Sequence, residues 1–105
     1  MSNLSCESSN IIYLITCKKD DCIEHPQYVG ETGRRLADRF LEHRRSVLNS
    51  DISKPVGAHF NDGGHNDCHM QVVAIEQIRS TNPWIRKIRE KFYIRLLDCQ
   101  LNKNI

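Results

Sequence analysis

Two tyrosines in short apolar segments are the first candidates for chemistry in this sequence. Tyr13 ends the run Ile-Ile-Tyr, and Tyr28 begins the run Tyr-Val-Gly, which Gly30 completes. A phenol can take part in proton transfer once its ionisation is eased, since a free phenol has a pKa of about 10. Each motif alone has an ordinary explanation, because tyrosines are common in strands and a glycine after a strand commonly begins a turn.

Four polar residues further along the chain can complete such a site. Arg39 and His43 lie four positions apart, on one face of a predicted helix. Glu90 stands among basic and apolar neighbours in the last predicted helix, and Asn102 follows 12 residues later. An ordinary ion pair between Arg39 and Glu90, or a helix cap at Asn102, is the structural alternative.

Two cysteines and two histidines are spaced as metal ligands. Cys17 and Cys22 enclose four residues, and His59 and His65 enclose five. Two thiolates and two imidazoles at such spacings suit a closed tetrahedral zinc site, which would tie a hairpin tip to the middle of a small domain. The alternative is a buried strand cysteine beside surface histidines, and spacing alone does not choose between the two.

Cys68 and His69 are rival ligands, because they follow soon after the second histidine. We rank them second, since a strand predicted to begin near Met70 should draw them away. The chain has five cysteines, an odd number. In an intracellular protein, reduced thiols or metal ligands are the default for such residues, not disulfides.

The length and composition indicate one compact intracellular domain. The chain has 105 residues, of which 39% are hydrophobic and 27% charged, with a net charge of +2. No apolar run approaches the roughly 18 residues of a membrane span, and the first residues do not form a secretory signal. We expect residues 1–9 to form a frayed tail and residues 10–105 to form the domain.

The hydrophobic pattern predicts an α+β fold with the element order ββααβα. The predicted strands are 10–17, 27–30 and 70–75. One helix should begin at Thr32 or Gly33 and run to about residue 48. A short helix with Ser53 as its cap should end near residue 60, and Thr81 or Asn82 should cap the last helix. Together these elements predict a small, mainly antiparallel sheet flanked by three helices.

The last predicted helix carries apolar side chains at regular spacing, and the first predicted helix carries a cluster of arginines. In the last helix, the residues that share one apolar face are Ile85, Ile88, Phe92 and Leu96, with Ile94 and Leu97 on a second side. We therefore expect that helix to be packed from two directions. In the first helix, the arginines that could contact DNA phosphates are Arg34, Arg35, Arg44 and Arg45. A solvated helix face is the alternative for such a cluster.

The combined set of residues resembles the GIY-YIG nuclease family, over residues 10–102. Tyr13 and Tyr28 stand in the two sequence motifs for which the family is named. Arg39 resembles the family's helix arginine, and His43 the polar residue one turn later. The residues that resemble its metal-binding glutamate and its C-terminal asparagine are Glu90 and Asn102. The resemblance implies a three-stranded antiparallel sheet flanked by helices. The sequence departs from the family's pattern at two points. Ile11 replaces the glycine of the first motif, and the interval between the two tyrosines is longer than is usual in the family.

The resemblance implies metal-dependent cleavage of a DNA phosphodiester, leaving a 5′ phosphate and a 3′ hydroxyl. Glu90 would hold a catalytic Mg²⁺ or Mn²⁺, and Arg39 would bind the phosphate oxygens. Tyr13 would take the proton of the attacking water, and Tyr28 would orient water or phosphate. His43 would relay a proton or hold the phosphate. Asn102 would position the glutamate or the end of the last helix.

The extra interval between the tyrosines is similar to that of one branch of the family, the endonuclease domains of Penelope-like retroelements. These domains carry a Cys-Cys-His-His set, which Cys17, Cys22, His59 and His65 match, so the resemblance implies a structural zinc. It also implies work with a fused or associated reverse transcriptase, in the nucleus. The alternatives are a structure-specific repair or recombination nuclease, and a zinc-containing DNA-binding module without catalysis.

Overall fold

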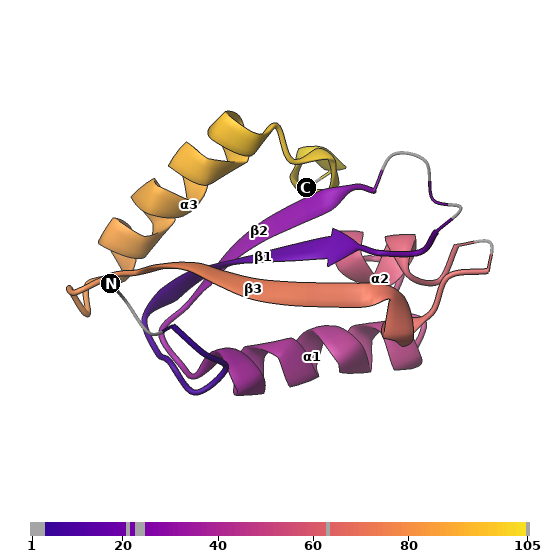
Figure 1. Cartoon of the computed structure of the whole chain (residues 1–105), viewed down its shortest axis with the longest axis horizontal. Helices are drawn as coiled ribbons and strands as arrows, with labels where there is room; N and C mark the ends of the chain where they lie inside the picture. Colours follow the sequence, from indigo (N-terminus) through magenta and orange to yellow (C-terminus); the bar gives the residue numbers. More distant parts are fainter. Residues whose placement is uncertain (1–3, 21, 23–24, 63, 105) are drawn as a thin grey trace.

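The computed structural model describes residues 4–20, 22, 25–62 and 64–104. Its elements, in chain order, are β1 (Ile11–Cys17), β2 (Gln27–Thr32), α1 (Leu36–Leu48), α2 (Pro55–His59), the 3₁₀ turn η1 (Asp67–His69), β3 (Met70–Gln77), α3 (Pro83–Leu97) and the 3₁₀ turn η2 (Gln100–Asn104). The predicted α+β class and the order ββααβα are confirmed (Figure 1).

The three strands form one antiparallel sheet in the order β2-β1-β3. The central position of β1 follows from its sequence, because its apolar residues can be buried on both faces. Tyr13 lies opposite Gly30 on β2 and opposite Ala74 on β3. The register between β1 and β3 shifts between Ile12 and Tyr13. Such a bulge bends a strand and changes the direction of neighbouring side chains.

The helices cover opposite faces of the sheet (Figure 1). Alternate side chains of β1 belong to two cores, as the period of a strand requires. One core joins β1 to α1 and α2, and its buried residues are Ile11, Tyr13, Ile15, Cys17, Leu36, Val47, Val56, Phe60 and Met70. The other core lies beneath α3, and its buried residues are Ile12, Val29, Ile78 and Cys99.

Helix α1 begins at Leu36, later than predicted, because β2 continues through Thr32 and a turn follows. The helix has no side-chain cap at its first residue. The segment before β1 supplies partners instead, since the N–H of Leu36 donates to the Ser8 carbonyl at 3.0 Å and that of Ala37 to the Cys6 carbonyl at 2.8 Å. The first three residues of the predicted tail lie outside the described residues.

The predicted cap of α2 is wrong. Lys54 occupies the capping position without a side-chain hydrogen bond, while the Ser53 hydroxyl donates to the Asp51 carboxylate. The backbone of Asp51 also constrains the helix, because a Cβ on Gly57 would lie 2.1 Å from the Asp51 carbonyl oxygen. The close approach of these two backbones therefore requires a glycine.

The predicted packing of α3 from two directions is also wrong. Asn82 caps the helix as predicted, by accepting the N–H of Trp84 at 3.0 Å. On the larger apolar face, however, Ile88 is 60% exposed and Phe92 is 45% exposed. The helix instead contacts the sheet through residues that recur with the same period, and among them are Arg86, Glu90, Tyr93 and Ile94. Among the described residues, no helix has both the length and the apolar character needed to cross a membrane.

Candidate active site and metal centre

Tyr13 is the centre of a buried polar cluster on the α1 face of the sheet. Its hydroxyl lies 2.7 Å from Nε2 of His43 and 3.1 Å from Nε of Arg39, and the phenol is 1% exposed. Both partners come from α1, where their spacing of four residues turns them toward the same strand. The structure thus brings together three of the residues that the sequence singled out.

The protonation states in this cluster follow from burial. Burial raises the pKa of Tyr13, and the nearby Arg39 guanidinium opposes the rise only in part. Burial, together with the charges of Arg39 and Lys54, lowers the pKa of His43 to about 4, against the opposing charge of Glu42. At neutral pH the phenol is therefore protonated and the imidazole is neutral. The Tyr13 hydroxyl then donates to His43, and Arg39 donates to the phenol oxygen.

Tyr28 joins the same cluster from β2. Its ring stands edge-on to the His43 ring, with 5.5 Å between the centroids. Burial is the main cause that raises the pKa of this second phenol, and Arg39 opposes the rise. The two tyrosines thus contact one imidazole from neighbouring strands, although 15 positions separate them in the sequence.

Gly30 belongs to this site and not to a turn. It lies inside β2 opposite Tyr13, and a Cβ there would be 2.3 Å from both Cζ and the hydroxyl oxygen of that phenol. Any side chain would therefore displace the ring that His43 and Arg39 hold. The sequence alone gives no sign of this contact, because strand pairing decides which side chain lies over the glycine.

Glu90 lies on α3, which packs against the edge strand β2, and its charge acts on the groups of the cluster. Its carboxylate is half-buried, and burial followed by the charge of Glu31 raises its pKa, while Lys87 and Arg39 oppose the rise. The charge of Glu90 in turn contributes to the raised pKa values of Tyr13 and Tyr28. These mutual effects place the Glu90 carboxylate within electrostatic range of Arg39 and of the two phenols.

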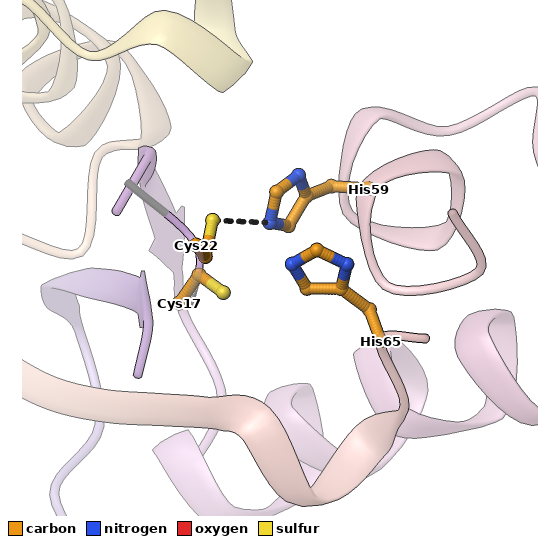
Figure 2. Close-up of side chains that lie close together, drawn as sticks. All are labelled: Cys17, Cys22, His59 and His65. Carbon is orange, nitrogen blue, oxygen red and sulfur yellow. Dashed lines mark hydrogen bonds between the residues drawn. The ribbon is translucent and has the colours of Figure 1, made fainter. Parts of the chain in front are cut away.

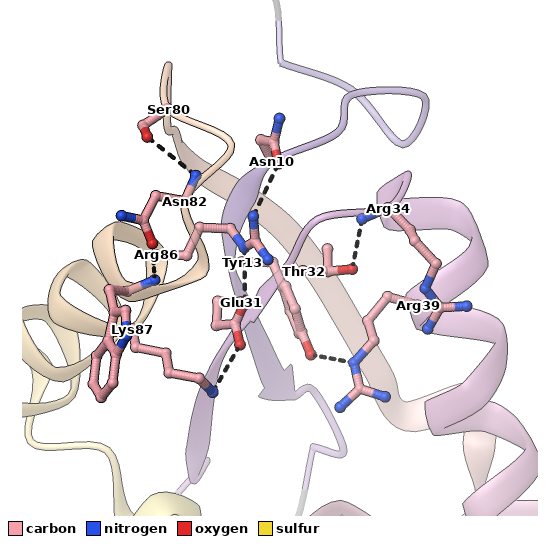
Figure 3. Close-up of polar contacts among 11 residues, drawn as sticks. Asn10, Tyr13, Glu31, Thr32, Arg34, Arg39, Ser80, Asn82, Arg86 and Lys87 are labelled. Carbon is pink, nitrogen blue, oxygen red and sulfur yellow. Dashed lines mark hydrogen bonds and ion pairs between the residues drawn. The ribbon is translucent and has the colours of Figure 1, made fainter.

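A second polar network fixes α3 against the end of β2 (Figure 3). Arg86 is 11% exposed at its side chain, and its Nε lies 2.9 Å from the Glu31 carboxylate. It also donates to Asn10 at 3.1 Å, while Lys87 lies 3.3 Å from the other carboxylate oxygen of Glu31. Because Arg86 is one helical turn before Glu90, this network positions the helix that carries the glutamate. No local pattern in the sequence predicts this network.

Asn102 holds the backbone of β2, not Glu90. Its side-chain oxygen accepts the N–H of Val29 at 2.8 Å, and its amide nitrogen donates to the Val29 carbonyl at 2.9 Å. The amide thus pairs with β2 as a neighbouring strand would. Val29 stands between Tyr28 and Gly30, so Asn102 fixes the segment that carries both.

The four arginines expected to contact DNA differ in their surroundings. Arg34 lies 2.6 Å from Glu42, and Arg44 lies 2.9 Å from Asp67. Arg35 pairs with two acids, Glu7 at 2.6 Å and Asp38 at 3.1 Å. Within the part of the chain that the structure describes, only the remaining one, Arg45, has no ion pair.

The predicted zinc ligands lie close together at the C-terminal end of β1 (Figure 2). Cys17 ends β1, Cys22 follows in the connection to β2, His59 ends α2, and His65 lies in the loop beyond. One ligand atom from each residue lies within 4.8 Å of the others. Sγ of Cys22 is 3.9 Å from Nε2 of His59, and the two imidazole centroids are 4.4 Å apart.

The chemistry of these four donors fits a metal ion such as zinc. Nδ1 of His65 lies 2.8 Å from the Asp62 carbonyl, so this nitrogen carries the proton and leaves Nε2 free. Nε2 of His65 is buried and has no hydrogen-bond partner. Burial raises the pKa of the Cys17 thiol and lowers that of His59. A bound cation would reverse the first effect, since it deprotonates a coordinating thiol.

The cluster needs little movement to close around zinc. With bonds of about 2.3 Å to sulfur and 2.0 Å to nitrogen, tetrahedral ligand atoms lie roughly 3.3–3.8 Å apart. Contraction by about 1 Å from the observed separations reaches that geometry. Cys68 is exposed, and Nδ1 of His69 accepts the Asn66 N–H at 3.0 Å, so the rival pair is held in the turn η1.

Comparison with known proteins gives this chain no relative. No protein-family model matches it, and neither does any curated protein or solved structure. What is shown is a small α+β domain with a three-stranded antiparallel sheet, a buried Tyr-His-Arg cluster, and a Cys-Cys-His-His cluster that could hold a metal ion.

Proposed function

We propose that this chain is a metal-dependent DNA endonuclease domain that nicks one strand. The observation that carries the proposal is the hydroxyl of Tyr13, held 2.7 Å from a neutral His43 and 3.1 Å from Arg39 beside the half-buried Glu90. A proton acceptor, an anion-binding cation and a metal-binding carboxylate are what hydrolysis of a phosphodiester needs. The resemblance of these residues to the GIY-YIG nucleases supports the same activity.

The proton of the attacking water passes through Tyr13 to His43. A phenol whose pKa is raised by burial is a poor base while it keeps its own proton. The short contact to His43 gives that proton an acceptor, because the phenol oxygen can take the water proton as its own proton moves to the neutral Nε2. Relay of a proton thus suits His43 better than phosphate binding, since its imidazole is buried and already engaged.

Arg39 neutralises charge on the phosphate while it keeps Tyr13 in place. Its Nε donates to the phenol at 3.1 Å, and one terminal nitrogen lies 2.7 Å from Glu42. Glu90 would hold the divalent cation, because its half-buried carboxylate has no ion pair among the described residues. A bound Mg²⁺ or Mn²⁺ supplies Lewis-acid catalysis at the phosphate and the leaving 3′ oxygen.

The Cys-Cys-His-His cluster supports assignment to the Penelope-like branch of these nucleases. A zinc ion there would be structural, because four protein ligands leave no open position for a substrate. In that branch the nick exposes a 3′ hydroxyl, which a fused or associated reverse transcriptase extends in the nucleus. We propose this role for the chain, with DNA as its substrate.

The experiment is an end analysis of nicked plasmid. Supercoiled plasmid is incubated with the zinc-loaded protein and Mg²⁺ or Mn²⁺, beside the Glu90→Gln variant. We expect open circles only with the intact protein, and we expect DNA polymerase to extend the nicks without prior removal of a 3′ phosphate. Binding of plasmid without nicking under any of these conditions would make the chain a DNA-binding module and refute the nuclease assignment.

The metal centre has its own test. Elemental analysis of the purified protein should find one zinc per chain, lost in Cys22→Ser and His65→Ala but kept in Cys68→Ser. The last variant is a matched control, because Cys68 is exposed and lies outside the cluster. Equal zinc in all the variants would exclude the assigned ligands.

A further inference from the structure

A cleft opens directly from the Tyr-His-Arg cluster. It has a volume of about 500 Å³, and its walls are α1 and the first residues of α2. Tyr28, Arg39 and His43 of the proposed active site line it, together with Arg45 and Lys54. A molecule bound at Arg39 would therefore extend into this cleft.

The cleft is built for negative charge. Three cations line it against one acid, Glu42. Hydrogen bonds from Arg34 and Arg39 hold the pKa of Glu42 at about 2, so those arginines already balance its charge. Arg45 and Lys54 are exposed, and neither has an ion pair within the described ranges. The charge of Lys54 is also close enough to the cluster to lower the pKa of His43.

The far wall of the cleft is fixed in place. Lys54 immediately precedes α2, whose Val56 is 1% exposed and whose following residue Phe60 is fully buried. The helix ends at His59, inside the cluster of candidate metal ligands. A cation on such a wall loses less freedom on binding than one on a mobile loop.

We propose that Arg45 and Lys54 bind a second backbone phosphate of the DNA strand that is cut. Arg45 follows Arg39 by six residues, a rise of about 9 Å along the helix, and B-DNA advances about 3.4 Å per nucleotide. A neighbouring phosphate of the same strand is therefore within reach of Arg45 and Lys54 when Arg39 binds the scissile one. This inference rests on the proposed nuclease function, because Arg39 defines the position of the scissile phosphate.

The second phosphate gives Arg45 and Lys54 a role that the ion-paired arginines of α1 do not share. Arg44, one residue earlier, is turned to Asp67 at 2.9 Å and lies outside the cleft. The contact would be to the backbone alone, so it would fix the register of the strand without reading its sequence.

The test measures DNA affinity without cleavage. A fluorescein-labelled duplex is titrated with the zinc-loaded Glu90→Gln protein at several salt concentrations, without a chelator. Arg45→Ala and Lys54→Ala are compared in that background with Arg79→Ala, which removes the same charge from an exposed residue outside the cleft. Each cleft variant should reduce the slope of log affinity against log salt by about 0.9, which is about five- to tenfold weaker binding near 0.1 M salt. Arg79→Ala should lose much less.

The inference and the nuclease assignment can fail separately. If Arg45→Ala and Lys54→Ala lose no more affinity than Arg79→Ala, the second phosphate site is refuted, whether or not the protein nicks plasmid. In a protein that nicks, Arg45→Ala should raise KM by a larger factor than it lowers kcat. Melting curves of all the variants check that the fold is intact.

Discussion

Replacing His43 by glutamine should flatten the dependence of stability on pH in the acidic range. His43 is 7% exposed, and its imidazole lies against the Tyr13 hydroxyl at 2.7 Å. Burial and the charges of Arg39 and Lys54 lower its pKa from 6.5 to about 4, while Glu42 acts in the opposite direction. Between these two values the unfolded chain binds a proton at this residue and the folded protein does not, so stability rises with pH.

The size of the effect follows from the shift. Each unit of pKa corresponds to 1.36 kcal/mol, so a fall from 6.5 to about 4 gives roughly 3 kcal/mol of unfolding free energy. That contribution is fully present above pH 6.5 and is lost as the pH falls toward 4. Glutamine can still accept a hydrogen bond from the phenol, but it does not titrate.

Urea unfolding of both proteins at a series of pH values measures this directly. The other titrating groups, including the metal ligands, are common to the two proteins, so the difference between their unfolding free energies isolates His43. We expect that difference to change by roughly 3 kcal/mol across the window. A difference that stays constant from pH 4 to 6.5 would show that His43 titrates normally, and the lowered pKa that we assign to its buried imidazole would be refuted.

Three further substitutions test the positions of individual side chains. Gly30→Ala should cost about 2 kcal/mol of unfolding free energy and abolish nicking, because its methyl group would displace the Tyr13 ring; wild-type melting and nicking would contradict this. Arg86→Met should destabilise the domain by about 3 kcal/mol, since it leaves the Glu31 carboxylate buried without its main partner, and urea unfolding checks it. Ile88→Asn should change unfolding free energy by less than about 0.5 kcal/mol because this side chain is 60% exposed, and a larger loss would mean that α3 packs through that face.

Local patterns were enough to predict the elements and much of the candidate site. Apolar runs indicated the strands, and Asn82 followed by Pro83 indicated the start of α3. The Cys and His spacing predicted the cluster of candidate metal ligands, because each pair is close in sequence and needs only one long-range contact to meet the other. Arg39 and His43 could be placed together for the same reason, since one helix carries both.

Features that depend on long-range pairing could not be predicted. Helix α3 has two rows of residues that repeat with the helical period. The row with the larger apolar side chains is the exposed one, and Arg86 faces the sheet, where it pairs with Glu31. The partner of Asn102 depends on where η2 crosses β2, and the sequence does not encode that locally. Arg44 differs from Arg45 by its ion pair with Asp67, an acid 23 residues further along the chain, at the start of the turn η1.

The rate of plasmid nicking tests the proposed catalytic cluster most directly. Open-circle formation is followed with excess zinc-loaded protein and Mg²⁺ or Mn²⁺, for the intact chain, Tyr13→Phe, Glu90→Gln and the matched control Tyr93→Phe, whose hydroxyl contacts Glu76 on the other face of the sheet. We predict nicking by the intact chain and by Tyr93→Phe, a loss of about 100-fold or more in Tyr13→Phe, and none in Glu90→Gln. Equal rates in Tyr13→Phe and Tyr93→Phe, or nicking that survives Glu90→Gln, would contradict the account.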